Sequence, residues 1–212
     1  MRAHEPPASI FFLAYAQCDE LDVVGPYAVL QTANRYLSQR TPPAPTIDLR
    51  IVAVDGAGAV ELHGPTGPQF VVTGIHGMTL GVQPWDGTTL PDVLIVAGGN
   101  TEPGTGVMQQ KDNTAFTTPI GRQFERGALV VSVCTGAFAL VGAGVAQGRL
   151  MTTHPGLVND LAACGVEVVN PDWTTGPRAS SRTRGSCRAA ASPRGSTKRS
   201  TWSKHAGRTI RS

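Results

Sequence analysis

One cysteine of this chain lies where an apolar run ends and a segment of small residues begins. Residues 128–133 read ALVVSV, Cys134 follows, and Thr135 and Gly136 lead into the segment AFALVGAGVA. This pattern predicts a buried strand that turns sharply into a helix, with the cysteine at the corner. A thiol at the start of a helix is expected to have a lowered pKa and to act as a nucleophile.

The same stretch allows two other interpretations. A cysteine within an apolar run is most often an inert part of the core. Residues 128–147 also carry no charge over 20 residues, which is the length of a membrane helix. Two soluble elements fit this stretch better than a membrane helix, because it contains Gly136, Gly142 and Gly144 and has polar residues in its middle. This stretch alone leaves the role of the cysteine open.

A carboxyl group and a pair of glycines elsewhere could complete a thiol site. Asp22 precedes Pro26 by four residues, and Gly98 and Gly99 follow the apolar run at 93–97. A carboxyl group in a closed pocket can exchange a proton with a thiol, and glycine amides can stabilise negative charge. The alternatives are a carboxylate that only stabilises a helix N-terminus and an ordinary turn.

The elements that must position these residues alternate between strands and helices. The sequence predicts a domain over residues 9–173, with strands at 9–15, 47–54, near 69–72, 93–97, 128–133 and 166–169, and helices at 26–38, 111–126 and near 155–164. This order predicts an α/β fold with a mostly parallel sheet. In such sheets the site lies beyond the carboxyl ends of the strands, where the cysteine and the glycine pair fall.

Composition narrows the class of protein further. The four cysteines are far apart and form no metal-ligand spacing, so we expect no metal, and nothing else in the sequence implies an organic cofactor. The N-terminal octet MRAHEPPA reads as a flexible leader and lacks the apolar core of a secretory signal. We therefore expect a cytoplasmic protein that has no membrane segment.

Four segments together resemble the ThiJ/PfpI (DJ-1-like) superfamily. They are LDVVGPYAVL at 21–30, DVLIVAGG at 92–99, VVSVCTGAFALVGAGV at 130–145 and GRLMTTHPG at 148–156. The most similar branch contains isonitrile hydratases and the ligand domains of arabinose-regulator-type transcription factors. The resemblance implies a flavodoxin-like, three-layer sandwich related to class I glutamine amidotransferases, and it also implies a homodimer.

The resemblance assigns roles to residues by their positions. Cys134 falls on the nucleophile, Asp22 on the acid that contacts the thiol, and Thr135 on the residue whose amide and hydroxyl line the pocket. Glu20 is a competing acid. The positions implied for substrate binding are Gly98, Gly99, Gly136 and His154, the last as a pocket-edge residue more than as a base.

The resemblance implies the hydration of an isonitrile, a small-molecule substrate, to an N-substituted formamide. A glyoxalase-like or deglycase-like activity on small carbonyl compounds is a second possibility. A ligand-sensing domain without catalysis, or a stress sensor whose cysteine oxidises to a sulfinate, would use the same residues differently.

Residues 174–212 differ from the rest of the chain. Residues 1–173 hold 8 Lys and Arg against 15 Asp and Glu, whereas the tail holds 10 Lys and Arg, no acid, and only Ile210 from the set Val, Ile, Leu and Met. Such a segment is expected to be disordered. A basic tail that binds nucleic acid is one interpretation. We favour a shift of reading frame instead and therefore expect no nucleic-acid partner.

The tail is consistent with a shift of reading frame near Thr174. When each codon from Ser180 to His205 is moved one base upstream, one permitted translation is VVEDARLVPGGGVSAGIDEALHLVEA. That string resembles the closing strand, glycine turn and helix of the superfamily. The hypothesis implies that a strand, a turn near the thiol and a covering helix are missing from this chain.

Overall fold

The computed structural model describes residues 9–64 and 67–169. The predicted leader at 1–8 and the tail at 174–212 lie outside the described residues, and so does the segment assigned to the frame shift. Within the described residues, no helix is long and apolar enough to cross a membrane.

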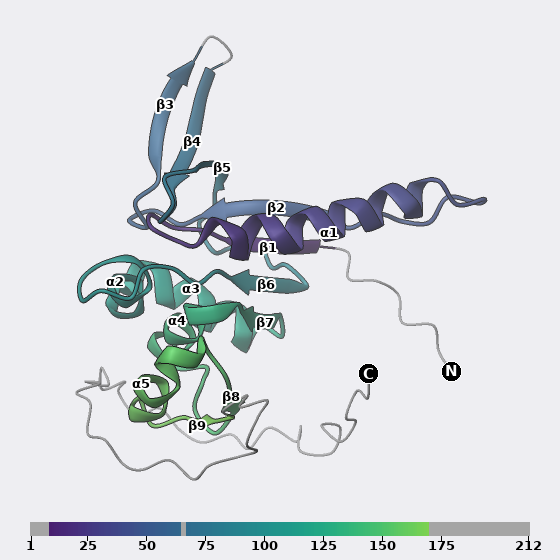
Figure 1. Ribbon diagram of the computed structural model, residues 1–212. Helices are drawn as coiled ribbons and strands as arrows, with labels where there is room; N and C mark the ends of the chain where they lie inside the picture. Colours follow the sequence, from purple (N-terminus) through teal and green to yellow (C-terminus); the bar gives the residue numbers. More distant parts are fainter. Residues whose placement is uncertain (1–8, 65–66, 170–212) are drawn as a thin grey trace, which may run out of the picture.

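A sheet of seven strands organises the described part of the chain (Figure 1). The spatial order is β3-β4-β5-β2-β1-β6-β7. Neighbours among β5, β2, β1, β6 and β7 pair in parallel, and the hairpin strands pair antiparallel. The strands are β1 (Ser9–Leu13), β2 (Asp48–Ala53), β3 (Val60–Gly64), β4 (Gly67–Thr73), β5 (Thr79–Pro84), β6 (Val93–Val96) and β7 (Leu129–Ser132).

Helices cover both faces of the parallel strands, which confirms the predicted three-layer α/β architecture. On one face, Phe12 packs edge-on against Tyr27 of α1 (Glu20–Ser38), with ring centroids 5.7 Å apart. On the other face, α2 (Gly106–Asp112) and α3 (Thr114–Glu125) pack beside α4 (Ala137–Gly142). Successive side chains of a strand point to opposite faces, and the neighbouring Phe11 accordingly contacts Trp85 at 6.1 Å.

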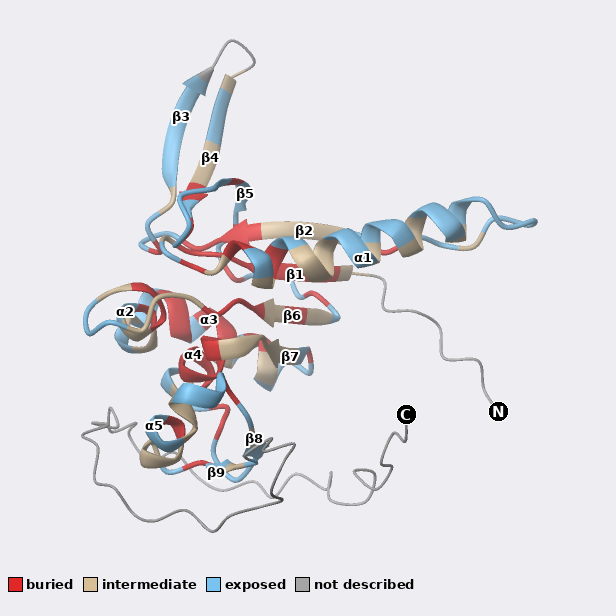
Figure 2. Ribbon diagram, viewed as in Figure 1, coloured by how far each residue is buried: buried red, intermediate tan, exposed pale blue. Residues whose placement is uncertain are grey.

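The core is continuous through the middle of this sandwich (Figure 2). Residues 10–15 of β1 and the turn after it are almost completely buried, as expected for a central strand covered on both faces. The long hairpin of β3 and β4 projects away from the core and is mostly exposed (Figure 2). The site described below therefore lies at the carboxyl ends of the most buried strands.

The helix predicted at 26–38 begins six residues earlier than the sequence suggested. It starts at Glu20, and the side chain of Asp19 caps it by accepting a hydrogen bond from the backbone N–H of Leu21 at 3.0 Å. Pro26 lies inside the helix and not in its first turn. The predicted start was wrong because the Asp19 cap is a stronger start signal than the proline. This earlier start places Asp22 in the first turn.

The remaining elements follow the predicted order with changed boundaries. The helix predicted at 111–126 is divided at Asn113, whose side chain caps α3 by accepting from the N–H of Ala115 at 3.1 Å. The third predicted helix consists of η2 (Pro155–Leu157) and α5 (Val158–Ala163). The strand predicted at 166–169 is β9 (Glu167–Val168), which pairs with β8 (Leu150–Met151) in a separate small sheet.

Within the described residues, β7 is the edge of the main sheet. Leu129 of this strand is 62% exposed, and Val131 is only half-buried. Both point to the face that carries α1, because their register partners Val93 and Ile95 lie on that face with Phe12. An open edge beside a partly exposed apolar face is unusual for a parallel sheet.

Candidate active site

The turn after β7 holds Cys134 in a strained conformation. Its φ is +51°, a value that non-glycine residues rarely adopt outside special sites. The backbone N–H of Val133 donates to the carbonyl of Val96 at 3.0 Å, so the chain stays attached to β6 up to the turn. It then enters the 3-10 helix η1 (Cys134–Gly136), which leads into α4. This confirms the predicted strand–turn–helix with Cys134 at its corner, a half-buried free thiol.

Gly136 allows this turn to lie directly on the sheet. A Cβ atom at this position would be 2.5 Å from the carbonyl oxygen of Val96 and 2.8 Å from that of Ala97. Those are backbone atoms of β6 and its end, so they cannot move aside without shifting the strand. The structure therefore gives the residue a packing role, whereas the sequence placed it among the substrate-binding positions.

Asp22 reaches the glycine pair from the first turn of α1. Its Oδ2 accepts a hydrogen bond from the backbone N–H of Gly98 at 2.9 Å, across 76 residues of sequence. Burial raises the pKa of this carboxyl above its ordinary value of 3.8, the Gly98 hydrogen bond opposes the rise, and the charge of Asp19 adds to it. A larger fraction of Asp22 is consequently protonated near neutral pH than for a solvated aspartate.

Thr135 occupies the second amide of the pair. Its Oγ1 accepts from the N–H of Gly99 at 2.8 Å and lies 3.1 Å from the carbonyl oxygen of the same residue, to which it donates. The two glycine amides were expected to face a ligand, but they hold Asp22 and Thr135 in place. The reason is steric, because a Cβ at Gly98 would be 2.6 Å from the Asp22 carboxyl and 2.9 Å from the Thr135 nitrogen.

The thiol of Cys134 does not have the lowered pKa that the sequence suggested. Burial raises its pKa above the ordinary value of 9.0, and the nearby charge of Asp22 raises it further. The amide and hydroxyl of Thr135 oppose this rise without cancelling it. The prediction was wrong because it considered the helix start alone and left out the burial of the thiol, which is the largest influence on its pKa, and the charge of Asp22. The pair Cys134 and Asp22 therefore tends to retain a proton.

The predicted pocket-edge residue His154 is exposed and serves the backbone around it. Its Nδ1 accepts from the N–H of Gly156 at 3.2 Å and thereby caps η2. The preceding Thr153 is buried and contacts the elbow, because its Oγ1 donates to the carbonyl of Cys134 at 3.2 Å. Within the TTH motif, the second threonine supports the site more directly than the histidine.

Tyr15 and Cys18 lie beneath the site, and no sequence pattern indicated a role for the tyrosine. The Tyr15 hydroxyl donates to the carbonyl of Ala97 at 3.1 Å, and its ring packs against Phe116 of α3. Burial raises the pKa of Cys18 to about 11, so this thiol stays protonated. Cys18 is therefore not a second nucleophile of the site.

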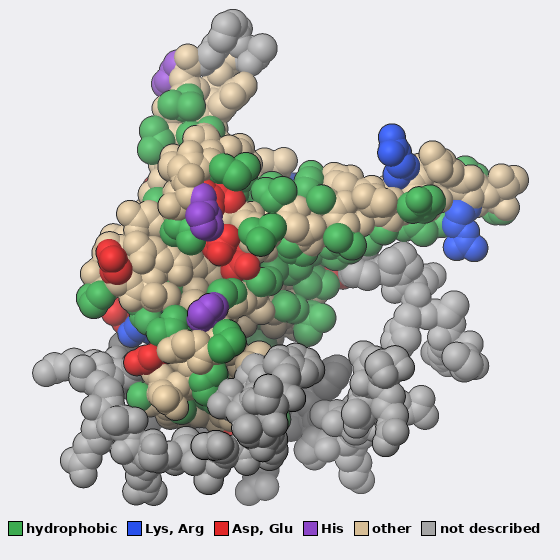
Figure 3. Space-filling view, in the orientation of Figure 1, with side chains coloured by type: hydrophobic (Ala, Val, Ile, Leu, Met, Phe, Trp, Pro, Cys, Tyr) green, Lys and Arg blue, Asp and Glu red, His purple; other side chains and the backbone are tan. Residues whose placement is uncertain are grey.

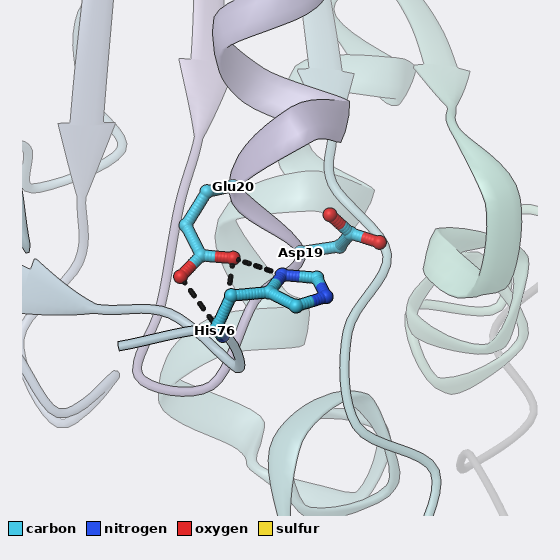
Figure 4. Close-up of side chains that lie close together, drawn as sticks. All are labelled: Asp19, Glu20 and His76. Atoms are coloured by element: carbon cyan, nitrogen blue, oxygen red, sulfur yellow. Dashed lines mark hydrogen bonds and ion pairs between the residues drawn. The ribbon is translucent and has the colours of Figure 1, made fainter. Parts of the chain in front are cut away.

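Asp19, Glu20 and His76 form a cluster at the start of α1 (Figure 4). The buried Glu20 carboxylate accepts from the backbone N–H groups of His76 and Met78, both at 3.0 Å, and pairs with the His76 ring at 2.8 Å. Burial would raise the pKa of Glu20, but these hydrogen bonds outweigh it and hold the pKa below 4.5. The hydrogen bond to Glu20 in turn raises the pKa of His76.

This cluster fixes the β4–β5 turn to the start of α1 and does not supply the acid of the site. All the Glu20 hydrogen bonds described above go to the turn, so the competing acid has a structural task. Potential ligand atoms of the three side chains lie within 4.8 Å of one another. The Glu20 oxygens are engaged with N–H donors, so the set fits a clamp better than a metal centre.

Chemically, the described residues provide a nucleophile and one acid, but the two glycine amides are not free to bind an oxyanion. Cys134 can form a bond to carbon, and Asp22 can carry its proton. Both amides of the glycine pair are engaged by Asp22 and Thr135. A reaction that moves a proton without building lasting charge on oxygen therefore suits this geometry best.

Comparisons with known proteins are consistent with this geometry. The chain is 30% identical over 145 residues to an isonitrile hydratase of Pseudomonas putida, covering 68% of this chain and 51% of that protein. It is 31% identical over 114 residues to a deglycase of Pyrococcus abyssi, covering 50% of this chain and 66% of the deglycase. The chain thus spans about half and about two thirds of the lengths of these relatives.

A structural comparison and a family model define the relationship. The crystal structure of Drosophila melanogaster DJ-1beta matches with a TM-score of 0.59 and 16% identity, covering 79% of this chain and 76% of that one. At that identity the match supports the flavodoxin-like fold alone. The model of the DJ-1/PfpI family matches residues 8–185. With this match over most of its length, the chain belongs to the DJ-1/PfpI family.

Proposed function

We propose that this protein is a thiol-dependent hydratase that converts isonitriles into N-substituted formamides. The observation that carries the proposal is the placement of the Asp22 carboxyl on Gly98, next to the strained elbow at Cys134. Burial favours the protonated forms of both side chains. A paired thiol and acid that share a proton are what the addition of S–H across a carbon centre requires.

In the first step the sulfur of Cys134 attacks the terminal carbon of R–N≡C. The S–C bond forms, one C–N π bond breaks, and the carbon takes a proton. Asp22 relays the thiol proton to that carbon, which gives the thioimidate R–N=CH–S–Cys134. No electron donor or acceptor is needed, because the step is an addition.

In the second step a water molecule attacks the same carbon while Asp22 accepts one of its protons and passes it to nitrogen. The resulting adduct, R–NH–CH(OH)–S–Cys134, loses its hydroxyl proton to Asp22 as the C–S bond breaks. The products are R–NH–CHO and the thiol, which regains the proton from Asp22. The net reaction consumes one isonitrile and one water.

The described donors support this reaction over carbonyl chemistry. A small aldehyde or ketone attacked by a thiol places charge on oxygen, and catalysis of that step benefits from several free N–H donors. Gly98 and Gly99 use theirs on Asp22 and Thr135. In isonitrile addition the charge develops on carbon, where one proton donor suffices.

Parallel assays of ethyl isocyanide and methylglyoxal with the full-length chain test this proposal. We expect N-ethylformamide to form at a rate that depends on protein concentration, with slower or no loss of methylglyoxal. Consumption of methylglyoxal alone would favour the deglycase-like alternative. Turnover of neither compound, by protein shown to be folded, would refute catalysis of both kinds and favour a ligand-sensing role.

A further inference from the structure

The acidic residues around Cys134 are arranged on one glycine. The backbone N–H of Asp19 donates to the carbonyl of Gly98 at 2.8 Å, while Asp22 accepts from the N–H of that same glycine at 2.9 Å. The backbone of Asp19 and the carboxyl group of Asp22, three residues further along, are therefore both held at the end of β6. The Asp19 side chain is half-buried, and its Oδ1 is held by the N–H of Leu21.

The charge of Asp19 acts on each ionisable group of the site. It raises the pKa of Asp22, of Cys134 and of the buried Cys18 and Tyr15. None of the influences on these four pKa values comes from a lysine or arginine. Within the described residues, the field at the thiol is therefore negative.

Four of the seven described lysine and arginine side chains make contacts outside this site, and Arg40 is exposed just past the end of α1. Figure 3 shows acidic and histidine side chains on one face; the larger lysine and arginine side chains of this view lie far from them, and a small basic patch adjoins acidic side chains at the left edge. The contacts agree: Arg50 pairs with Asp48 and Lys111 with Asp112, Arg126 and Arg149 donate to carbonyl oxygens, and Arg35 and Arg122 lie in the last turns of α1 and α3.

The one positive partner in the cluster is already neutralised. The imidazole of His76 lies 2.8 Å from the buried Glu20 carboxylate, so a protonated His76 carries a paired charge. The other nearby histidine, His154, is exposed and uses its Nδ1 to cap η2. The Asp19 carboxylate lies within 4.8 Å of the His76 imidazole and raises its pKa, so two carboxylates with one imidazolium leave one net negative charge in the cluster.

We propose that Asp19 makes the site selective for neutral and cationic substrates over anionic ones. The inference deepens the proposed function, on which it rests for the identity of the substrate, and it adds a charge requirement that the function does not specify. In water, a carboxylate changes the local concentration of a singly charged group about 6 Å away by about threefold. It raises the concentration of a cation and lowers that of an anion, so the two differ by about tenfold.

The first test measures the charge preference without any catalysis. Cys134 is modified with the cationic 2-(trimethylammonium)ethyl methanethiosulfonate or the anionic 2-sulfonatoethyl methanethiosulfonate, and labelling of its peptide is followed by mass spectrometry. The labelling rate of each reagent is divided by its rate with 2-mercaptoethanol, which serves as a reference thiol. We expect the resulting ratio of cationic to anionic rates to exceed about ten and to fall with added salt. A ratio near one would overturn the proposal.

The variant Asp19→Asn assigns this preference to one residue. Asparagine keeps the side-chain oxygen that caps the helix, so α1 should still begin at the same place. We expect the ratio to fall about tenfold in this variant and to stay unchanged in Glu125→Gln, which removes an exposed carboxyl group at the end of α3. An equal ratio in Asp19→Asn and the unaltered protein would contradict the role of Asp19.

The second test uses three isonitriles of similar size: the neutral ethyl isocyanide, the cationic (2-isocyanoethyl)trimethylammonium and the anionic isocyanoacetate. We expect kcat/KM to be lowest for the anion. In Asp19→Asn, the ratio of kcat/KM for the anion to kcat/KM for the cation should rise about tenfold. Hydration of all three at equal rates would refute the charge inference while supporting the proposed function. A preference for the cationic methanethiosulfonate without hydration of any isonitrile would support the charge inference and refute the proposed function.

Discussion

Replacing Gly98 by alanine tests whether the glycine pair positions the acid and the threonine. Gly98 is not among the glycines with positive φ, so alanine is strained there only by crowding. Its Cβ would lie 2.6 Å from Oδ2 of Asp22, 2.8 Å from Oγ1 of Thr135 and 2.9 Å from the backbone nitrogen of Thr135. The carboxyl can move, but the backbone of the elbow cannot do so cheaply.

The size of the effect follows from these distances. An ordinary Cβ contact begins at 3.4 Å, so the Asp22 oxygen must retreat by roughly 0.8 Å and weaken its bond to the Gly98 amide. A displacement of about 1 Å at a reacting group can lower the rate about a hundredfold. The disturbed hydrogen bond to a charged group also lowers the free energy of unfolding by about 1–3 kcal/mol.

Two measurements separate these effects. We expect Gly98→Ala to lower kcat/KM for N-ethylformamide formation about a hundredfold and to lower the urea midpoint of unfolding. The matched control is Gly25→Ala in α1, whose Cβ would meet only Leu21 Cδ1 at 3.7 Å, and which should add about 0.5–1 kcal/mol of stability. Full activity in Gly98→Ala would refute the idea that this glycine positions Asp22 and Thr135.

Three further predictions concern protonation and the open sheet edge. In Asp22→Asn the pKa of the Cys134 thiol should fall, because a charge that raises it is removed, and iodoacetamide labelling measured against pH will show this. Burial raises the pKa of Asp22, so the stability contributed by its neutral form is present below pH 3.8 and is lost as the pH rises. The urea midpoint of the variant should therefore exceed that of the unaltered protein only at higher pH. In Glu20→Gln the contact between Glu20 and the β4–β5 turn should weaken, and the free energy of unfolding should fall by about 1–3 kcal/mol. The pKa of Glu20 is lowered, so its contribution to stability is present above pH 4.5 and is lost as the pH falls through the folded-state pKa. A difference in stability between the variant and the unaltered protein that persists at pH 2 would contradict this prediction. Restoring the reading frame near Thr174 should raise the free energy of unfolding by at least about 1 kcal/mol, because covering the exposed 62% of Leu129 alone is worth about that much. A restored chain of equal stability, or a coding sequence without a one-base shift, would refute the hypothesis.

The elbow could be predicted from the sequence because its signal is local. An apolar strand that ends at Cys134, followed by small residues, has few other interpretations in an α/β chain. The role of Asp22 came from the resemblance and not from any pattern around it. Its true position depends on where α1 starts, and the Asp19 cap was overlooked in favour of Pro26.

The parts that could not be predicted depend on contacts between distant residues. The bond from Gly98 to Asp22 spans 76 residues and the bond from His76 to Glu20 spans 56. No period or motif encodes which partner a backbone amide will find. The direction of the thiol pKa was mistaken because burial, the largest influence on it, comes from distant parts of the chain that pack around Cys134, and the charge of Asp22 adds to it.

The most direct test of the central claim is the rate of N-ethylformamide formation by Cys134→Ser beside Cys18→Ala. Cys18 is completely buried and its thiol stays protonated, so its replacement controls for the general effect of losing a cysteine near the site. We predict that Cys134→Ser lowers kcat/KM at least about a thousandfold and that Cys18→Ala remains active. Retained hydration in Cys134→Ser, with folding confirmed by circular dichroism, would contradict the assignment of Cys134 as the nucleophile.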